Sequence, residues 1–250
     1  MSYHQLIRSE LRKLSSTKMP WAFLAVLAAI AAVNATAVIW GTDFDGSKTF
    51  VSTAADQQSL MAFAANATMI AGLFGAIAVA REYGHHTVIP TFLAEPRRHR
   101  AVLSQLVAVA IGGGLIGMIG AALTAGAVAL SLPTTEFDFL VSFGGVGRVL
   151  VAATFAGAAG AVLGAGLGAL VRNTGGAVTA TVLALIVAPP LIVQLVNDAA
   201  SWVPSTLAHT LSGVAIDTDV DPAAAIAALG AWALVPAALG LAAVVRRDVA

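Results

Sequence analysis

Six long apolar runs, separated by short polar segments, dominate the pattern of this chain. The runs cover residues 20–40, 58–80, 101–131, 147–171, 176–197 and 222–245. Each matches or exceeds the roughly 20 residues that an α-helix needs to cross the hydrocarbon core of a bilayer. The runs are continuously apolar and do not alternate with a period of two, which favours helices over a β-barrel. The pattern predicts an all-α integral membrane protein with six transmembrane helices in one domain, 1–250.

Residues 3–16, ahead of the first run, form a basic amphipathic pattern. The apolar stripe consists of Leu6, Ile7, Leu11 and Leu14, and the charged face of Arg8, Glu10, Arg12 and Lys13. A helix of this kind lies in the headgroup plane, where its basic side chains reach anionic membrane lipid. A short soluble helix or a frayed tail is the alternative.

Composition excludes several classes of function. Only 10% of the residues are charged, 58% are hydrophobic and the mean hydropathy is +0.88, whereas soluble domains carry about 25% charged residues. The formal net charge is zero, so no global field attracts nucleic acid. Because the chain contains no cysteine, disulfides, thiolate catalysis and cysteine-ligated metals are excluded.

Charged residues predict the orientation in the membrane, since cytoplasmic loops carry an excess of Lys and Arg. One side collects Arg8, Arg12, Lys13, Lys18, Arg81, Arg97, Arg98, Arg100, Arg172, Arg246 and Arg247. The other side carries Asp43, Asp45, Asp56, Glu136, Asp138, Asp198, Asp217, Asp219 and Asp221, with Lys48 and Arg148. Both termini are therefore expected in the cytoplasm, and the features fit a multi-pass protein of a bacterial inner membrane.

No motif for an energy source is found in the chain. The segment GTDFDGSKT places Ser47, not glycine, directly before Lys48, so it does not match a phosphate-binding loop. Apart from Arg148 at the mouth of the fourth run, the six runs contain no Asp, Glu, Lys, Arg or His, which is a poor fit to proton or sodium coupling. We therefore expect no catalytic residue and no bound cofactor in this chain, and expect energy to arrive from another subunit.

Metal chemistry is not indicated either. His85 and His86 stand near Glu82, but neighbouring side chains on a helix point about 100° apart and do not converge on one ion. The segment DTDVD resembles the start of a calcium loop but continues with Pro222 in place of the required glycine. The sequence predicts no metal site.

Small residues recur at four-residue spacing in the third and fourth runs. Gly160, Gly164 and Gly168 form one series, and Gly113 and Gly117 another. This spacing bares one face of a helix and allows close helix contact. We expect these contacts within one chain, although the spacing alone also permits contacts between two chains.

Two segments between the runs stand out. Residues 198–221, including SWVPSTLAHTLSG, are moderately apolar and predict either an extracellular hairpin that dips into the outer leaflet or an ordinary loop. Residues 81–100, REYGHHTVIPTFLAEPRRHR, combine basic residues with the apolar Val88, Ile89, Phe92 and Leu93. The arginines alone are sufficient to set the orientation of the chain in the membrane. The apolar side chains are not needed for that, so they suggest a docking surface on this cytoplasmic loop.

The chain resembles the membrane (permease) subunit of a type-2 ATP-binding-cassette (ABC) exporter. The resemblance is carried by SELRKLSST ahead of the first run, by the 81–100 loop and by VPSTLA before the last run. In this family, the loop that corresponds to residues 81–100 typically contains Arg-Glu, then Gly-Thr, then a proline followed by basic residues. Arg81, Glu82, Thr87, Pro96 and Arg98 fit this pattern, but His86 replaces the glycine.

The resemblance implies a permease dimer, of identical or homologous chains, coupled to two copies of a separate ATPase that binds ATP and Mg. The 81–100 loop would dock into that ATPase. The coupling residues would be Arg81, Glu82, Thr87, Val88, Ile89, Phe92, Leu93, Arg97 and Arg98.

Candidate substrate-pathway residues are polar or aromatic side chains of the second and fifth runs. They are Phe63, Asn66, Thr68, Phe74, Thr179 and Thr181. Most such residues simply mediate helix contacts. Two other functions stay open from the sequence: a non-transporting membrane scaffold or sensor that docks another cytoplasmic protein, and an ion-coupled secondary transporter.

Overall fold

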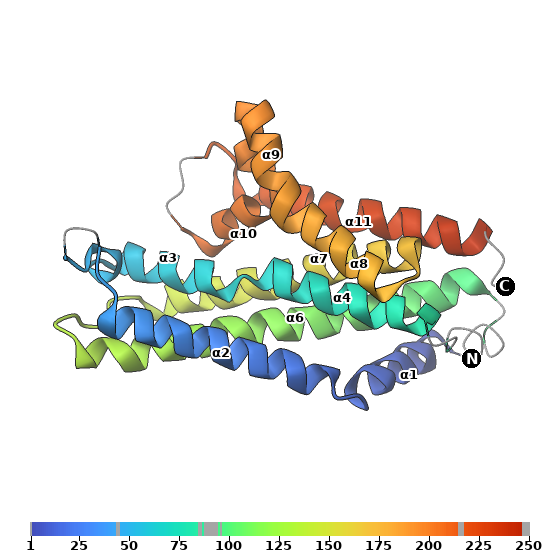
Figure 1. Ribbon diagram of the computed structural model, residues 1–250, viewed down its shortest axis with the longest axis horizontal. Helices are drawn as coiled ribbons and strands as arrows, with labels where there is room; N and C mark the ends of the chain where they lie inside the picture. The colour runs from blue at the N-terminus through green and yellow to red at the C-terminus, as the bar shows by residue number, and fades with distance from the viewer. Residues whose placement is uncertain are drawn as a thin grey trace.

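The computed structural model describes residues 2–43, 46–84, 87, 95, 97–214 and 218–246, without the side chains of residues 63–65 and 197–198. The helices are α1 (Tyr3–Ser15), α2 (Met19–Trp40), α3 (Ala54–Ala65), α4 (Ala67–Gly84), α6 (Arg98–Ser131), α7 (Phe143–Val171), α8 (Thr174–Val182), α9 (Ala188–Leu195), α10 (Pro204–Ser212) and α11 (Pro222–Arg246). A π-helical segment, η3 (Leu183–Val187), joins α8 to α9, and short 3₁₀ turns form η1 (Thr49–Val51), η2 (Leu132–Thr134) and η4 (Asn197–Trp202). Six of the resulting segments are long and apolar enough to cross a membrane. The prediction of an all-α membrane protein is confirmed (Figure 1).

The two ends of the bundle differ in charge. The basic end holds α1 and the last turns of α4, α7 and α11, and the chain enters and leaves the described structure there (Figure 1). Its described arginines beyond α1 are Arg81, Arg97, Arg98, Arg100, Arg172 and Arg246. The opposite, acidic end carries Asp43, Asp56, Glu136, Asp138, Asp219 and Asp221. Which end faces the cytoplasm stays a prediction.

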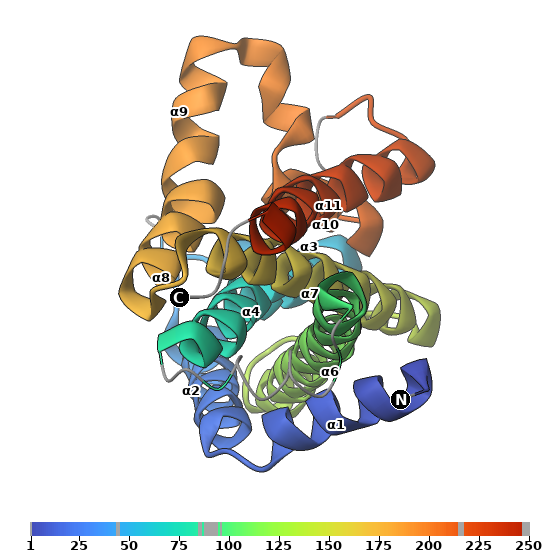
Figure 2. The same ribbon diagram turned by 90° about the vertical axis from the view of Figure 1, so that its right-hand side faces the viewer.

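Helix α7 is the centre of the bundle, with α4, α6 and α11 packed around it (Figure 2). Its glycines allow this packing, because a Cβ at Gly160 or Gly164 would overlap the backbone of Thr68 or Gly72 in α4. Gly117 of α6 faces the backbone of α7 in the same way. The expected close glycine contacts therefore form within one chain.

The second span departs from its predicted continuous form over 58–80. It consists of α3 and α4, interrupted at Asn66, whose φ of 32° and ψ of 42° place it in the left-handed region. Asparagine adopts this conformation more readily than most residues. The break could not be predicted from the apolar run, because the hydropathy of a segment says nothing about its backbone angles.

The fifth span leaves the bundle. After α8, which packs on α4 and α7, the π-helical segment precedes the Pro189–Pro190 pair at the start of α9. Prolines lack the N–H that an α-helical ladder needs and clash with the carbonyl one turn back, which accounts for the wider turn. Helix α9 then projects away from the other helices (Figures 1 and 2), and Leu191 and Leu195 are 53% and 84% exposed.

Residues 198–221 return to the bundle and contain α10, which packs against α7 and α11. Both ends of this return are held by hydrogen bonds. At its start, the Trp232 indole N–H donates to the carbonyl of Trp202 at 3.0 Å. At the end of α10, Arg148 Nε donates to the Leu211 carbonyl at 3.0 Å and Gln58 Nε2 to the Ser212 carbonyl at 2.7 Å. The described part of this segment is thus a packed helix with its last carbonyls capped, not an extended loop.

Candidate functional site

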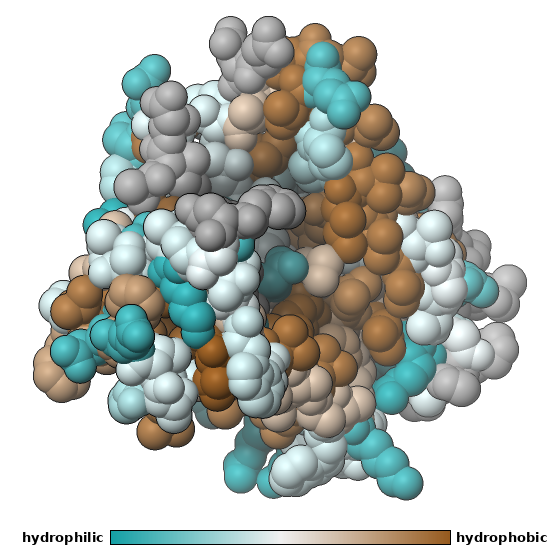
Figure 3. Space-filling view, turned by 60° about the vertical axis from the view of Figure 1, so that its left-hand side comes forward, coloured by the Kyte–Doolittle hydropathy of each residue, from teal (hydrophilic) through white to brown (hydrophobic). Residues whose placement is uncertain are grey.

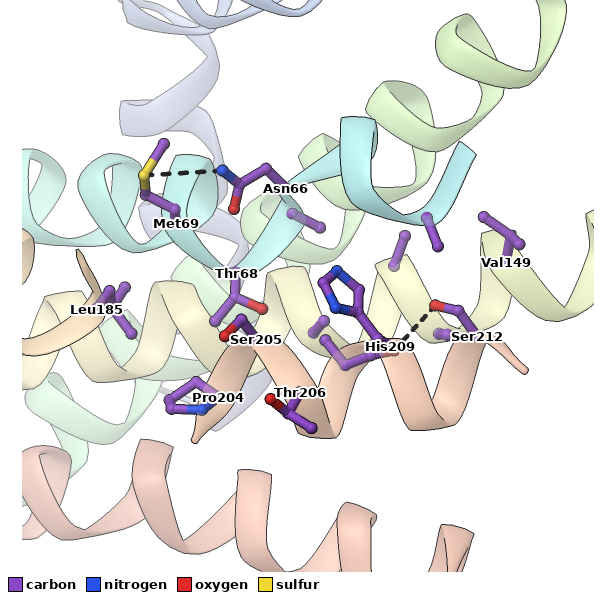
Figure 4. Close-up of a pocket in the computed structure, with 16 residues that line it drawn as sticks. Asn66, Thr68, Met69, Val149, Leu185, Pro204, Ser205, Thr206, His209 and Ser212 are labelled. Carbon is purple, nitrogen blue, oxygen red and sulfur yellow. Dashed lines mark hydrogen bonds between the residues drawn. The ribbon is translucent and has the colours of Figure 1, made fainter. Parts of the chain in front are cut away.

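A cavity of about 430 Å³ lies where α4, α7 and α10 meet. Figure 4 shows it beside the break in the second span. Its α7 wall consists of Ala152, Ala153 and Ala156, each at most 5% exposed. Because these side chains are small, α10 packs on α7 without filling the space. The volume is within the range of about 300–1,000 Å³ that is usual for small-molecule sites.

Polar side chains also line the cavity. They come from the start of α4 and from α10, and comprise Asn66, Thr68, Ser205, Thr206, His209 and Ser212. Among the described lining residues, His209 is the one that can carry a charge. The surface near the acidic end is hollowed beside a band of apolar side chains (Figure 3). Burial lowers the pKa of His209 to about 4, so this side chain is neutral at neutral pH. The site therefore combines an uncharged polar face with apolar walls, which suits an amphiphilic ligand.

The predicted pathway residues separate into two groups. Asn66 and Thr68 line the cavity. Phe74 is 3% exposed and packs edge to face on Phe23, with ring centroids 5.5 Å apart, in the core formed with α2 and α6. Thr181 is fully buried and bonds the Ala177 carbonyl.

Two further pathway residues lie elsewhere. Thr179 is exposed on α8 and bonds the Gly175 carbonyl at 3.0 Å. The side chain of Phe63 lies outside the described residues. Of the six predicted pathway side chains, the structure thus brings Asn66 and Thr68 to the cavity.

The contribution of α10 to the cavity was not predicted from the sequence. Ser205, Thr206 and His209 belong to the segment interpreted as a hairpin or loop. A signal was present, because Pro204 begins α10 in the way that proline commonly begins a helix. Only the tertiary fold places this helix against α7.

A second cluster of interest lies at the basic end, where α1 meets the end of α4. Lys13 Nζ is 2.6 Å from Glu10 Oε1 and 3.5 Å from Glu82 Oε1. Burial acts to lower the pKa of Lys13, but the nearby Glu82 and Glu10 carboxylates outweigh it and raise the pKa above 10.5. We call Glu10, Lys13 and Glu82 the α1–α4 ion cluster.

Helix α1 has the predicted amphipathic form, with one difference. Leu6 is buried and Leu14 packs at the core, whereas Arg8 and Arg12 are exposed. Ile7 and Leu11 are half-buried. Glu10, expected on the charged face, is only 5% exposed, because it turns inward to pair with Lys13.

The described part of the predicted coupling loop continues from α4. Thr87 Oγ1 donates to the Glu82 carbonyl at 3.3 Å. Glu95, ahead of α6, pairs with Nη1 of Arg100 in the first turn of α6 at 3.3 Å, while Arg97 is exposed.

Other predicted coupling residues mark the ends of the flanking helices. Arg81 is half-buried in the last turn of α4, and Arg98 begins α6. Val88, Ile89, Phe92 and Leu93, the predicted docking side chains, lie outside the described residues.

A third contact at this end joins three spans. The Arg172 guanidinium carbon lies 5.3 Å from the centre of the Tyr83 ring, and Arg172 Nη2 donates to the Ala243 carbonyl at 3.3 Å. Arg172 ends α7 with a φ of 57°. The last turn of α4 is therefore held on one side by α1 and on the other by α7 and α11.

No metal-binding group is found within the described residues, since no three His, Asp or Glu side chains there lie close enough to share an ion. Comparison with the models of known protein families finds none that matches this chain, and no curated protein matches it.

Proposed function

We propose that this chain is the membrane subunit of an ATP-driven exporter of the type-2 ABC class. Two permease chains would form the substrate pathway. Two copies of a separate ATPase, holding ATP and Mg, would supply the energy through the 81–100 loop. The bundle would lie in a bacterial inner membrane with both termini in the cytoplasm, as the distribution of arginines predicts.

The observation that carries this proposal is the position of α4. Its first turn, at Thr68, borders the cavity, and its last turn, at Glu82, belongs to the α1–α4 ion cluster and leads into the 81–100 loop. A continuous helix transmits a displacement of one end to the other. A partner that moves the loop would therefore move the wall of the cavity, as alternating access requires.

The break at Asn66 supports this role. It separates α4 from α3, and α3 is held at the acidic end by buried Gln57. The Gln57 side chain donates to the carbonyls of Val51 and Asp138 at 3.0 and 2.9 Å and accepts the Leu140 N–H at 2.9 Å. Helix α4 can therefore tilt at the cavity while α3 stays attached to its loops.

In a permease pair, α9 would form part of the contact between the two chains. This helix exposes Leu191 and Leu195 beyond the bundle, as does Val196 directly after it, and a second permease chain would cover such a face. Lipid would also cover it, so the contact between the two chains needs its own test.

Co-purification tests the coupling. The double variant Phe92→Asp with Leu93→Asp should lose a co-expressed ATPase from the detergent-solubilised complex while the permease remains monodisperse. Tyr3→Asp with His4→Asp places two carboxylates at exposed positions at the start of α1 and should keep the ATPase. Undiminished ATPase with the loop variant would refute the coupling role.

Reconstitution in liposomes and affinity purification distinguish an ATP-driven exporter from a secondary transporter and from a scaffold or sensor. Permease and ATPase together in liposomes should move substrate only with ATP and Mg. Ion-gradient-driven transport by the permease alone would identify a secondary transporter instead. Affinity purification from the native membrane that recovers a cytoplasmic protein other than an ATPase would favour a scaffold or sensor.

A further inference from the structure

Two helices begin at the cavity. Helix α4 starts at Ala67 and α10 at Pro204, and both residues line it. First-turn N–H groups have no partner within their own helix, and helix dipoles add a partial positive charge there. No side chain caps the start of α10. The positive ends of two helices therefore converge on one uncharged space.

Thr68 gives a second and independent indication of a ligand. It is 7% exposed and lines the cavity, yet within the described chain its hydroxyl has no hydrogen-bond partner. The buried hydroxyls of Thr124 and Thr181 each donate to a carbonyl four residues back. The Thr68 hydroxyl opens onto the cavity, so a ligand there can accept the hydrogen bond that it does not make within the described chain. Figure 4 shows Thr68 in the space between α4 and α10, on the side where Ser205 and His209 lie.

We infer that this cavity binds the anionic headgroup of an amphiphile, a phosphate or a carboxylate. The headgroup would accept hydrogen bonds from the Thr68 hydroxyl and from the first turns of α4 and α10, where no described acidic side chain opposes it. The apolar tail would lie along the alanine wall of α7 and Leu185. This inference rests on the proposed export function for its role as substrate class, but the binding itself needs no ATPase.

Equilibrium dialysis of the purified full-length permease, in an uncharged detergent and without ATPase, tests the inference. The probes are radiolabelled dodecyl phosphate, dodecanoate and dodecanol, which share one tail. At least one anionic probe should bind saturably and about ten-fold or more tighter than dodecanol, since hydrogen bonds to a charged group are the stronger ones. The tighter of the two anions identifies the headgroup as phosphate or carboxylate. Equal affinity for all three probes would overturn the inference.

Variants locate the site. Thr68→Val should weaken anion binding roughly ten-fold, while Thr68→Ser, which keeps the hydroxyl, should bind like the wild type. Ser205→Asp places a carboxylate at the start of α10 and should abolish anion binding. Thr179→Val removes a hydroxyl from the exposed face of α8 and should change nothing.

If the affinity for the anion is unchanged in both Thr68→Val and Ser205→Asp, and both variants remain monodisperse, the site lies elsewhere and the inference is overturned. Failure here is distinguishable from failure of the proposed function. Permease that binds no anion can still co-purify with an ATPase, and permease without an ATPase can still bind the anion.

Discussion

Lys13 and Glu82, 69 positions apart in the chain, meet at the basic end with Nζ and Oε1 separated by 3.5 Å. The contact fastens the amphipathic α1 to the last turn of α4, which is the beginning of the 81–100 segment proposed to dock an ATPase. Glu10 shares the same ammonium at 2.6 Å. Two largely buried carboxylates thus share one lysine as their charge partner, so removing the Lys13 ammonium leaves both without it.

Lys13→Met should therefore lower the stability of the purified permease. The Lys13 side chain is 41% exposed, so solvent screens the interaction and we expect a loss of about 1 kcal/mol. Because the folded-state pKa of Lys13 is raised above 10.5, its contribution is fully present at lower pH and disappears as pH rises through that value. Thermal unfolding should show a constant wild-type-to-variant difference between about pH 8 and 9.5 that shrinks above about pH 10.5. A difference that grows in that alkaline range would contradict the ion-pair assignment.

Gly164→Ala should destabilise the bundle although alanine is the better helix former. A Cβ at Gly164 meets the Gly72 backbone of α4, and overpacking of this kind costs about 1–3 kcal/mol. Gly126→Ala is the matched control, because a Cβ there meets nothing within 4 Å, and helix propensity should make it neutral or slightly stabilising. Melting temperatures in detergent decide the matter, and equal shifts for both variants would disprove the tight α4–α7 contact.

Arg148→Met should loosen α10. The Arg148 guanidinium bonds the carbonyls of Leu211 and Thr210 at 3.0 and 3.4 Å, and its loss leaves the end of the helix without these donors. The natural chain has no cysteine, so Leu207→Cys, at a fully buried position, can report opening by maleimide alkylation. We expect the rate to rise about ten-fold when Arg148→Met is added. An unchanged rate would show that the Arg148 hydrogen bonds do not hold α10 in place.

Leu195→Cys should crosslink two permease chains if the partner is an identical copy. Leu195 is 84% exposed at the end of α9, and Leu130 of α6, 81% exposed, is the matched apolar control. A short bismaleimide added to native membranes should give a dimer band with Leu195→Cys and none with Leu130→Cys. Crosslinking of both or of neither would argue against α9 as the contact between identical chains.

The helices were largely predictable, whereas the site was not. Apolar runs predict spans because burial in lipid depends on composition and length, and the observed helices begin and end within a few residues of the predicted runs, the break at Asn66 apart. The glycine series predicts close helix contact because glycine has no Cβ, so its spacing alone shows which helix face leaves the backbone bare. Thr68 and Asn66 were candidates by type, but so were Thr179 and Phe74, which lie away from the cavity. Nothing in their own residue types distinguishes these two pairs.

The sequence by itself determined the all-α membrane class, the amphipathic α1 and the separation of basic from acidic loops, since each follows from residue type and spacing. Only the tertiary structure decided that Glu10 turns inward to Lys13, that the second span breaks at Asn66 and that α10 packs onto α7. The cavity depends on all the elements that surround it, because it is the space left where α4, α7 and α10 meet. Such a space is a property of packing between distant segments, and no local pattern contains it.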